Sequence, residues 1–176
     1  MTTRTTTTTT TATTTAAVLA CAALLTAPTA LADALQACGT YAEDRSTSRD
    51  ETLSRTQTWL DSRVRYSQRT CHENEHGSYR TDCSGYVSLA WGLDRSRPTS
   101  GLAEVSREIP REELMPGDAL NSAGHVALFV RWEDQARTRP VVREHTGPDG
   151  EPVVERSWSP ETAAGYTPIR YDKIAG

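Results

Sequence analysis

Apolar and polar positions repeat with a helical period in the first half of this chain and with a strand period in the second half. A helix is predicted to start after Ser48, because Ser48 and Glu51 have the spacing of a capping box. Its stripe at helical spacing, which Trp59 flanks, has four members: Leu53, Thr56, Leu60 and Val64. Because only one side of this helix is apolar, we expect it to pack against the next helix or the sheet.

The segment TDCSGYVSLAW, residues 81–91, predicts a second helix with a cysteine in its first turn. Asp82 is a good N-cap, since its carboxylate can accept hydrogen bonds from the free backbone N–H groups at the helix start. The apolar residues that share one side of this helix are Tyr86, Val87, Ala90 and Trp91. We expect that side to be buried and the helix to end at Gly92.

Strands are predicted where the apolar period shortens to two. Pro116-Gly117-Asp118 indicates a turn that leads into the first strand. The next segment, AGHVALFVRW, alternates between two faces: His125, Ala127, Phe129 and Arg131 on one, and Val126, Leu128, Val130 and Trp132 on the other. The segments VVREHT and PVVERSW flank the turn GPDG as a hairpin, and TPIRY is a further strand.

Residues 67–80 and 93–112 are polar and are predicted to be loops. With helices early and strands late, the chain is predicted to have an α+β fold. In this fold an antiparallel sheet packs on the helix that carries Cys83.

Residues 1–32 are predicted to be a signal peptide. Their only charged side chain is Arg4, and a threonine-rich lead is followed by an apolar run that ends in Ala30-Leu31-Ala32, an A-x-A cleavage site. The run is too short for a membrane span of about 20 residues, and neither Cys21 nor Cys38 is placed for lipidation. The alternative is a low-complexity tail. Residues 33–176 then form one domain of a protein that is secreted, extracellular or associated with the cell wall.

The charge of the mature chain excludes some classes of partner. The leader removes one of the 19 basic residues and none of the 23 acidic ones, which leaves a formal charge of −5. A general nucleic-acid or anionic-membrane binder needs a basic surface, so neither is expected. Wall polymers remain compatible with this charge, because they can be bound in a local groove.

Cysteine usage singles out Cys83. Cys38, Cys71 and Cys83 remain after cleavage, and an odd number in a secreted protein indicates one thiol outside the disulfide set. A thiol at a helix N-terminus lies at the positive end of the helix dipole, which favours the nucleophilic thiolate. The alternative is a small buried core residue. If Cys83 is reactive, Cys38 and Cys71 are the natural disulfide pair; otherwise the pair differs or all three are free.

A group of potential metal ligands precedes this helix: Cys71, His72, Glu73, Glu75 and His76. The group lacks a second pair of ligands at a zinc-finger spacing, and a disulfide would consume Cys71. We interpret it as a solvated loop with one disulfide cysteine, and we expect no metal and no cofactor.

A cysteine nucleophile needs a base, and His125 is the best-placed imidazole because it begins a strongly patterned strand. The alternative is a histidine that only bonds backbone at a strand end. A third group should orient the imidazole. Glu144 and His145 both lie on the next strand and point to opposite faces, so only one of them can face His125.

The segments TDCSGYVSLAW, LMPGDAL, GHVALFVRW and REHTG, in this order, resemble the NlpC/P60 family of papain-like cell-wall cysteine peptidases. The resemblance covers about residues 50–156. It implies a papain-like α+β fold with Cys83 as the nucleophile, His125 as the base and Glu144 as the orienting residue. The family position of Glu144 commonly holds His, Asn or Gln, and His145 is the alternative in this chain.

The resemblance also implies a substrate class, the peptide stems of peptidoglycan, and cleavage of a γ-D-glutamyl-diaminopimelyl type of bond. It places Tyr66, Asp82 and Ser84 at the substrate-binding site, although Tyr66 can equally be a core aromatic residue. The segment RTCHENEHGSY departs from the family pattern as an insertion. The competing functions are another cysteine amidase or acyltransferase with the same dyad, and a catalytically silent module that binds the wall.

Overall fold

The structure is a computed structural model that describes residues 1–3, 38 and 41–176. Apart from residues 1–3, the predicted signal peptide lies outside the described residues. Within the described ranges, no helix is both long enough and apolar enough to cross a membrane.

The centre of the fold is a six-stranded sheet in which every neighbouring pair is antiparallel, with the order β4-β9-β5-β6-β7-β8. The six strands are β4 (Ser106–Glu108), β5 (Ala119–Asn121), β6 (Val126–Trp132), β7 (Pro140–Glu144), β8 (Val154–Ser157) and β9 (Thr167–Tyr171). The predicted α+β class with an antiparallel sheet is therefore confirmed, including the β7–β8 hairpin and the strand TPIRY.

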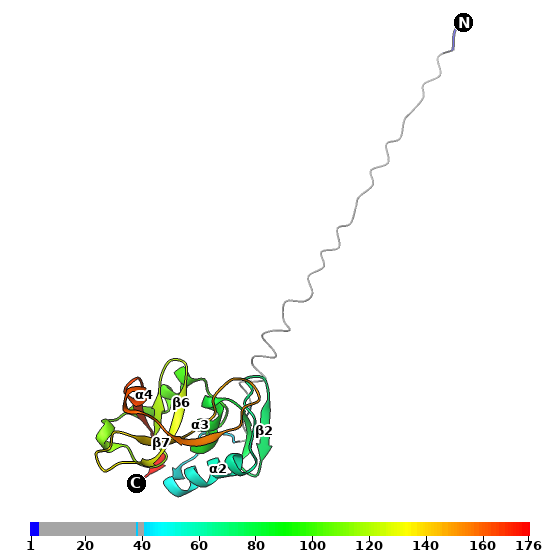
Figure 1. Ribbon diagram of the computed structural model, residues 1–176. Coiled ribbons are helices and arrows are strands. Elements are labelled where there is room, and N and C mark those ends of the chain that lie inside the picture. The colour runs from blue at the N-terminus through cyan, green and yellow to red at the C-terminus, as the bar shows by residue number, and fades with distance from the viewer. Residues whose placement is uncertain (4–37, 39–40) are drawn as a thin grey trace.

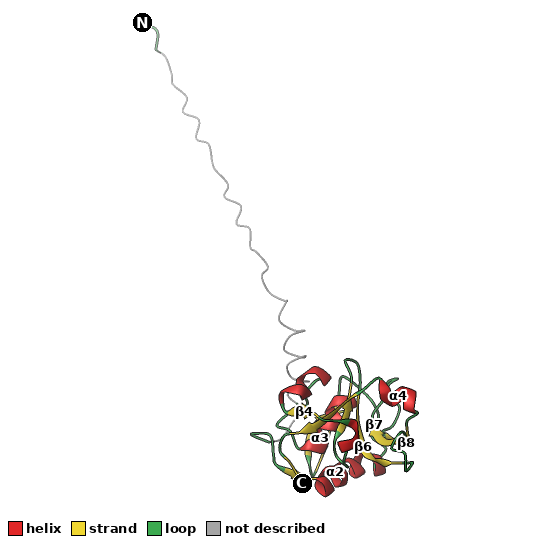
Figure 2. Ribbon diagram, turned by 90° about the vertical axis from the view of Figure 1, so that its left-hand side faces the viewer, coloured by secondary structure: helices red, strands yellow, loops and turns green. Residues whose placement is uncertain are grey.

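Helices and two smaller strand pairs surround this sheet (Figures 1 and 2). The helices are α2 (Arg49–Asp61), α3 (Cys83–Trp91) and α4 (Pro160–Ala164), with 3-10 turns η1 (Thr99–Glu104) and η2 (Arg111–Glu113). The smaller pairs are β1 (Thr47–Ser48) with β10 (Ile174–Ala175), and β2 (Cys71–Asn74) with β3 (Gly77–Arg80). Figure 1 shows α3 at the centre, with the β2–β3 hairpin on one side and β6 and β7 on the other.

The first helix, α2, has the predicted capping box. The Ser48 hydroxyl accepts from the Glu51 N–H at 3.2 Å, and the Ser48 N–H donates to the Glu51 carboxylate at 2.8 Å. The predicted stripe is confirmed in part: Thr56, Val64 and the flanking Trp59 are buried, and Leu53 and Leu60 are partly buried against the cores. The prediction missed two further buried residues of this helix, Thr52 and Arg55. This part of the face is polar because it meets the C-terminal end of α3, where Arg55 donates to the Ala90 carbonyl at 3.1 Å.

The second helix, α3, begins and ends as predicted. The Asp82 carboxylate accepts from the Gly85 N–H at 2.8 Å, and Gly92 ends the helix with a left-handed φ of 65°. The predicted burial of the side with Tyr86, Val87, Ala90 and Trp91 is confirmed, and the rest of the helix from Cys83 to Trp91 is buried as well. The helix is enclosed by α2, the β2–β3 hairpin and β6, so its polar residues bond internally instead of facing water.

Two segments predicted as loops contain regular structure. Residues 71–80 form the β2–β3 hairpin, and residues 93–112 contain β4 and both 3-10 turns. The hairpin is polar on its exposed positions but buries Tyr79, whose hydroxyl donates to the Leu93 carbonyl at 2.7 Å. One buried aromatic among polar residues gives too weak a period for a strand to be recognised.

The alternation predicted for β6 holds up to Phe129. Val126 and Leu128 pack in the core beside α3, whereas Ala127 and Phe129 pack in a second core on the opposite face. A bulge between Phe129 and Arg131 then shifts the register, so that Trp132 lies against Phe129 with ring centroids 5.1 Å apart. Trp132 therefore lies on the Phe129 face, contrary to the prediction.

The predicted Pro116-Gly117-Asp118 turn leads into β5 and is held by a buried ion cluster. The Asp118 side chain is fully buried and bonds Arg49 of α2 at 3.1 Å and Arg170 of β9 at 2.7 Å. It also accepts from the Met115 N–H at 2.8 Å. This one carboxylate joins the first helix, the turn and the centre of the sheet.

Candidate active site

Cys83 is the first residue of α3 and is the free cysteine among the described residues. Its relative exposure is 8%, at the edge of the core beside Val126. The predicted disulfide between Cys38 and Cys71 is present, and it ties the segment before α2 to strand β2. The oxidised pair thus leaves Cys83 as the thiol available for chemistry.

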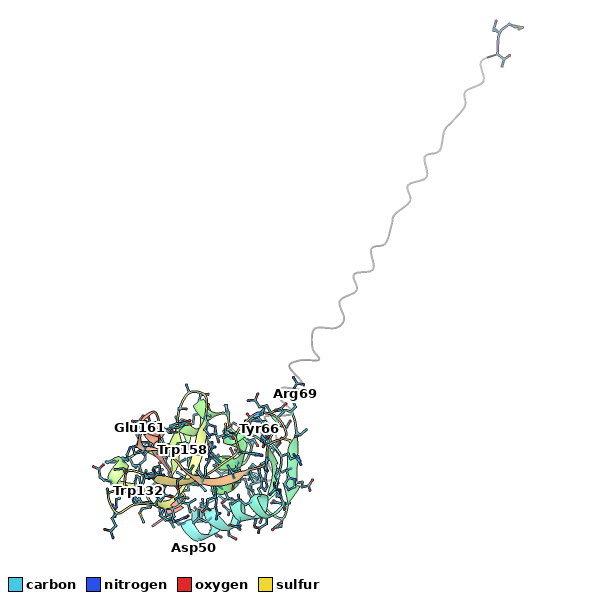
Figure 3. The ribbon with its side chains drawn as sticks, in the orientation of Figure 1. Asp50, Tyr66, Arg69, Trp132, Trp158 and Glu161 are labelled. Atoms are coloured by element: carbon cyan, nitrogen blue, oxygen red, sulfur yellow. A yellow bond between two sulfur atoms is a disulfide. The ribbon has the colours of Figure 1, made fainter. Side chains whose placement is uncertain are left out.

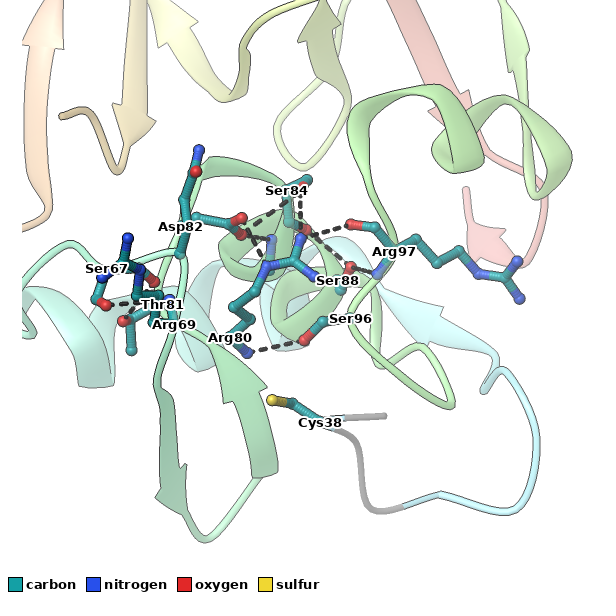
Figure 4. A network of polar contacts seen from close by, with 12 residues as sticks. Cys38, Ser67, Arg69, Arg80, Thr81, Asp82, Ser84, Ser88, Ser96 and Arg97 are labelled. Carbon is teal, nitrogen blue, oxygen red and sulfur yellow. Dashed lines mark hydrogen bonds and ion pairs between the residues drawn. The ribbon is translucent and has the colours of Figure 1, made fainter. Parts of the chain in front are cut away.

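The turn before Cys83 is fixed by a buried network around Arg80 (Figure 4). The Arg80 guanidinium donates to the Asp82 carboxylate at 2.6 Å and to the Ser84 hydroxyl at 3.0 Å. The Arg80 N–H donates to the Ser96 hydroxyl at 2.8 Å. Asp82 and Ser84, both predicted as substrate-binding residues, are 5% and 3% exposed, and their side chains are engaged in this network.

The glycine of the D-C-S-G segment is required by packing. A Cβ added at Gly85 would lie 1.9 Å from the carbonyl oxygen of Arg80, far closer than any side chain tolerates. The chain therefore doubles back tightly over the first turn of α3. Within the described part of the chain, the backbone N–H groups of Cys83 and Ser84 have no acceptor, and they lie at the positive end of the helix dipole.

His125 immediately precedes β6 and links Cys83 to Glu144. Its Nε2 lies 2.6 Å from the Glu144 carboxylate, and the Cys83 side chain is close enough to act on the pKa of His125. Because Glu144 occupies Nε2, Nδ1 is the nitrogen that remains for the sulfur. The structure thus brings together the three predicted residues Cys83, His125 and Glu144, from α3, the start of β6 and the end of β7.

The Glu144 side chain is 1% exposed and accepts three charge-assisted or indole hydrogen bonds. Besides His125, the donors are Arg156 Nε at 2.5 Å and Trp158 Nε1 at 2.8 Å, both to Oε1. Burial by itself raises the pKa of Glu144, but the bonds from His125, Trp158 and Arg156 outweigh it and lower the pKa. The carboxylate is therefore ionised and fixed in direction.

Burial by itself lowers the pKa of His125, but the hydrogen bonds and charges of Cys83 and Glu144 outweigh it. Together they raise the pKa of His125 to about 9. His125 is consequently an imidazolium at neutral pH, with the Cys83 side chain among the groups that favour its protonated form. A cysteine next to an imidazole is the pairing that nucleophilic cysteine catalysis requires.

His145, the alternative third residue, points away from His125. It is fully buried and lies edge-on against Trp59, Tyr66 and Tyr86, with ring centroids 5.5 to 6.2 Å away. Burial lowers the pKa of His145 to about 4, against the opposing effect of the backbone of Val64 and Glu151. His145 is thus a neutral packing residue under the ring of Tyr66.

Two tyrosines border the Cys83–His125 pair on different sides. Tyr66 is partly buried, and burial raises its pKa; the charges of Cys83 and Asp82 add to that rise, so Tyr66 lies within electrostatic range of both groups. Tyr166 meets the His125 ring at a centroid distance of 6.1 Å. Figure 3 shows Tyr66 and Trp158 on the same side of the domain, away from Asp50 of α2.

Sequence reasoning missed four residues of this site: Arg80, Arg156, Trp158 and Tyr166. For Arg156 and Trp158 the sequence does hold a signal, the strand period of two. Counted along β8 and one residue beyond it, these two positions fall on the same face of the sheet as Glu144. Arg80 and Tyr166 have none, because each reaches the site from a segment whose position depends on the tertiary fold.

No group of three or more His, Cys, Asp or Glu side chains within the described ranges is arranged to hold a metal ion. The side chains of His72 and His76 contact Trp59 and Glu75 respectively. Comparison with protein-family models, with curated proteins and with solved structures gave no match to this chain.

Proposed function

We propose that this protein is a secreted cysteine peptidase of the papain-like, NlpC/P60 type that hydrolyses the peptide stems of peptidoglycan. The single observation that carries the proposal is the chain of contacts Cys83–His125–Glu144 at the N-terminus of a buried helix. A thiol, an imidazole and a buried carboxylate in this order form a nucleophile, a general base and an orienting group.

The proposed reaction is acyl transfer through a thioester. The Cys83 thiolate attacks the amide carbonyl carbon, and the negative charge on oxygen is stabilised by the backbone N–H groups of Cys83 and Ser84. His125 then donates its proton to the amide nitrogen as the carbon–nitrogen bond breaks and the amine leaves. Neutral His125 next takes a proton from water, whose oxygen attacks the thioester, and the Cys83 thiolate departs.

Glu144 has two functions in this scheme. Its carboxylate holds His125 through Nε2, so that Nδ1 faces the sulfur, and its charge stabilises the imidazolium form. Because Glu144 itself is held by Arg156 and Trp158, the imidazole does not need to reorganise during the reaction.

The substrate class rests on the resemblance of the four sequence segments to wall peptidases and on the predicted signal peptide, with a γ-D-glutamyl-diaminopimelyl type of bond as the proposed target. Tyr66 is assigned to one wall of the substrate site, because it is partly exposed and lies within electrostatic range of Cys83. Asp82 and Ser84 contribute by holding the turn, and the Ser84 N–H is the group that faces the substrate.

The experiment that tests this proposal is a digestion of purified peptidoglycan by the mature protein and by Cys83→Ala, followed by mass spectrometry of the released fragments. We expect new termini within the peptide stem for the wild type and none for Cys83→Ala. A new terminus at the glycan–peptide junction would instead assign a cysteine amidase. Binding to peptidoglycan with no new terminus would assign a silent wall-binding module.

A further inference from the structure

Arg156 bonds the candidate site through one of its side-chain nitrogens, and its other nitrogens point to no partner in the site. Its Nε donates to Glu144 Oε1 at 2.5 Å, which fixes one edge of the planar guanidinium. Its side chain is nevertheless 55% exposed, and its two terminal nitrogens have no acceptor within the described residues. A guanidinium fixed in orientation with free donors is suited to a carboxylate, which can accept two parallel hydrogen bonds.

The neighbouring arginines of this sheet do not share that property. Arg131 and Arg143 both bond Glu155, at 2.8 and 2.9 Å, and Arg139 bonds Glu133 at 2.6 Å. Each of these cations therefore has a carboxylate partner outside the candidate site. The one carboxylate on Arg156 is Glu144, which is also bonded to His125.

The position of Arg156 indicates which half of a bound substrate it would face. Arg156 lies beyond His125 as seen from Cys83, because Glu144 separates it from the imidazole. Trp158 donates to the same Glu144 oxygen as Arg156, and the Tyr166 ring lies against Trp158 with centroids 4.5 Å apart. Both rings also lie next to His125, at centroid distances of 6.3 and 6.1 Å. Since His125 delivers the proton to the leaving amine, the amine half of the substrate lies on this side of the site.

From this geometry we propose that Arg156 binds a free carboxylate on the amine half of the peptide, next to the bond that is cut. The inference rests on the proposed function and specifies its substrate: an anionic peptide whose leaving residue carries an unblocked carboxylate. Tyr166 forms the aromatic surface along which that residue lies.

The test uses two synthetic stem peptides that differ only in the amine-side residue, which carries either a carboxylate or a carboxamide. A charge-assisted hydrogen bond contributes about 1.5–3 kcal/mol, so we expect the wild type to prefer the carboxylate in kcat/KM by roughly 10- to 150-fold. In Arg156→Gln this ratio should fall close to one. Arg156→Lys, which keeps the charge but loses the paired donors, should retain an intermediate ratio.

Trp158→Phe is the matched control, because Trp158 also donates to Glu144 Oε1 but carries no charge. It should lower kcat/KM for both peptides and leave their ratio unchanged. Equal cleavage of the two peptides by the wild type, or an unchanged ratio in Arg156→Gln, would overturn the inference while the peptidase proposal stands. Failure of the wild type to cut either peptide, together with intact peptidoglycan, would instead overturn the proposed function.

Discussion

Replacement of Glu144 by Gln is the change that most sharply separates a catalytic carboxylate from a structural one. Gln keeps the size of the side chain and can still hydrogen-bond, but it removes the negative charge 2.6 Å from His125 Nε2. In the wild type the pKa of His125 is raised to about 9 against the lowering effect of burial, so its two partners, Cys83 and Glu144, together supply the whole increase.

The magnitude follows from the contact distance. Loss of an opposite charge in direct contact shifts a pKa by about one to three units, so His125 should titrate near pH 8 or below in Glu144→Gln. At pH 8 the imidazolium fraction would then fall from roughly 90% in the wild type to half or less. The sign is fixed, because removal of an anion can only disfavour the protonated ring.

Two measurements can detect this lowering of the His125 pKa. NMR titration of the His125 ring should show the downward shift, and the alkaline limb of the kcat/KM profile should move to lower pH with it. The control is His145→Gln, since His145 faces the aromatic cluster and its replacement should leave the His125 titration in place. An unchanged His125 titration in Glu144→Gln would refute the assigned electrostatic role of Glu144.

Three further outcomes test the turn, the thiol and the ion cluster. Gly85→Ala should lower the free energy of unfolding by about 1–3 kcal/mol or more, because its Cβ would meet the Arg80 carbonyl oxygen; Gly124→Ala, with nothing within 4 Å, should be nearly neutral in the same denaturant titration. Alkylation of the mature protein should modify Cys83 and spare the two disulfide cysteines, as peptide mapping will show. Asp118→Asn should lower stability by about 3–5 kcal/mol in thermal or denaturant unfolding, since it removes the fully buried carboxylate that neutralises Arg49 and Arg170, whose side chains are 12% and 14% exposed.

The local features of the fold could be predicted because they depend on residues close in sequence. The capping box of Ser48 and Glu51, the Asp82 cap and the Gly92 terminus are each defined within one helical turn. The odd cysteine points to Cys83, and disulfide pairing between the other two follows from the oxidising compartment.

The features that sequence reasoning missed depend on the neighbours of each segment. Arg55 lies outside the predicted stripe of α2, yet it is buried because the end of α3 offers it a carbonyl. The full burial of α3 follows from three elements that enclose it, and none of them can be placed from the helix sequence alone.

The candidate site could be predicted from the sequence only in part. Strand alternation showed that either Glu144 or His145 faces His125, but the choice depends on the register of β6 against β7, which a bulge after Phe129 alters. Arg156 reaches Glu144 across the next strand pair, whose register depends on the turn between them. Pairing across a sheet is therefore what the sequence pattern leaves undetermined.

The central claim is that Cys83 carries the acyl group during cleavage of a wall stem peptide. The most direct measurement is cleavage in the presence of hydroxylamine, which intercepts a thioester and yields a hydroxamate of the acyl half. The account predicts that the wild type forms this hydroxamate in proportion to hydroxylamine concentration and that Cys83→Ala forms neither hydroxamate nor free acid. Hydrolysis that persists in Cys83→Ala, or that yields no hydroxamate in the wild type, would contradict it.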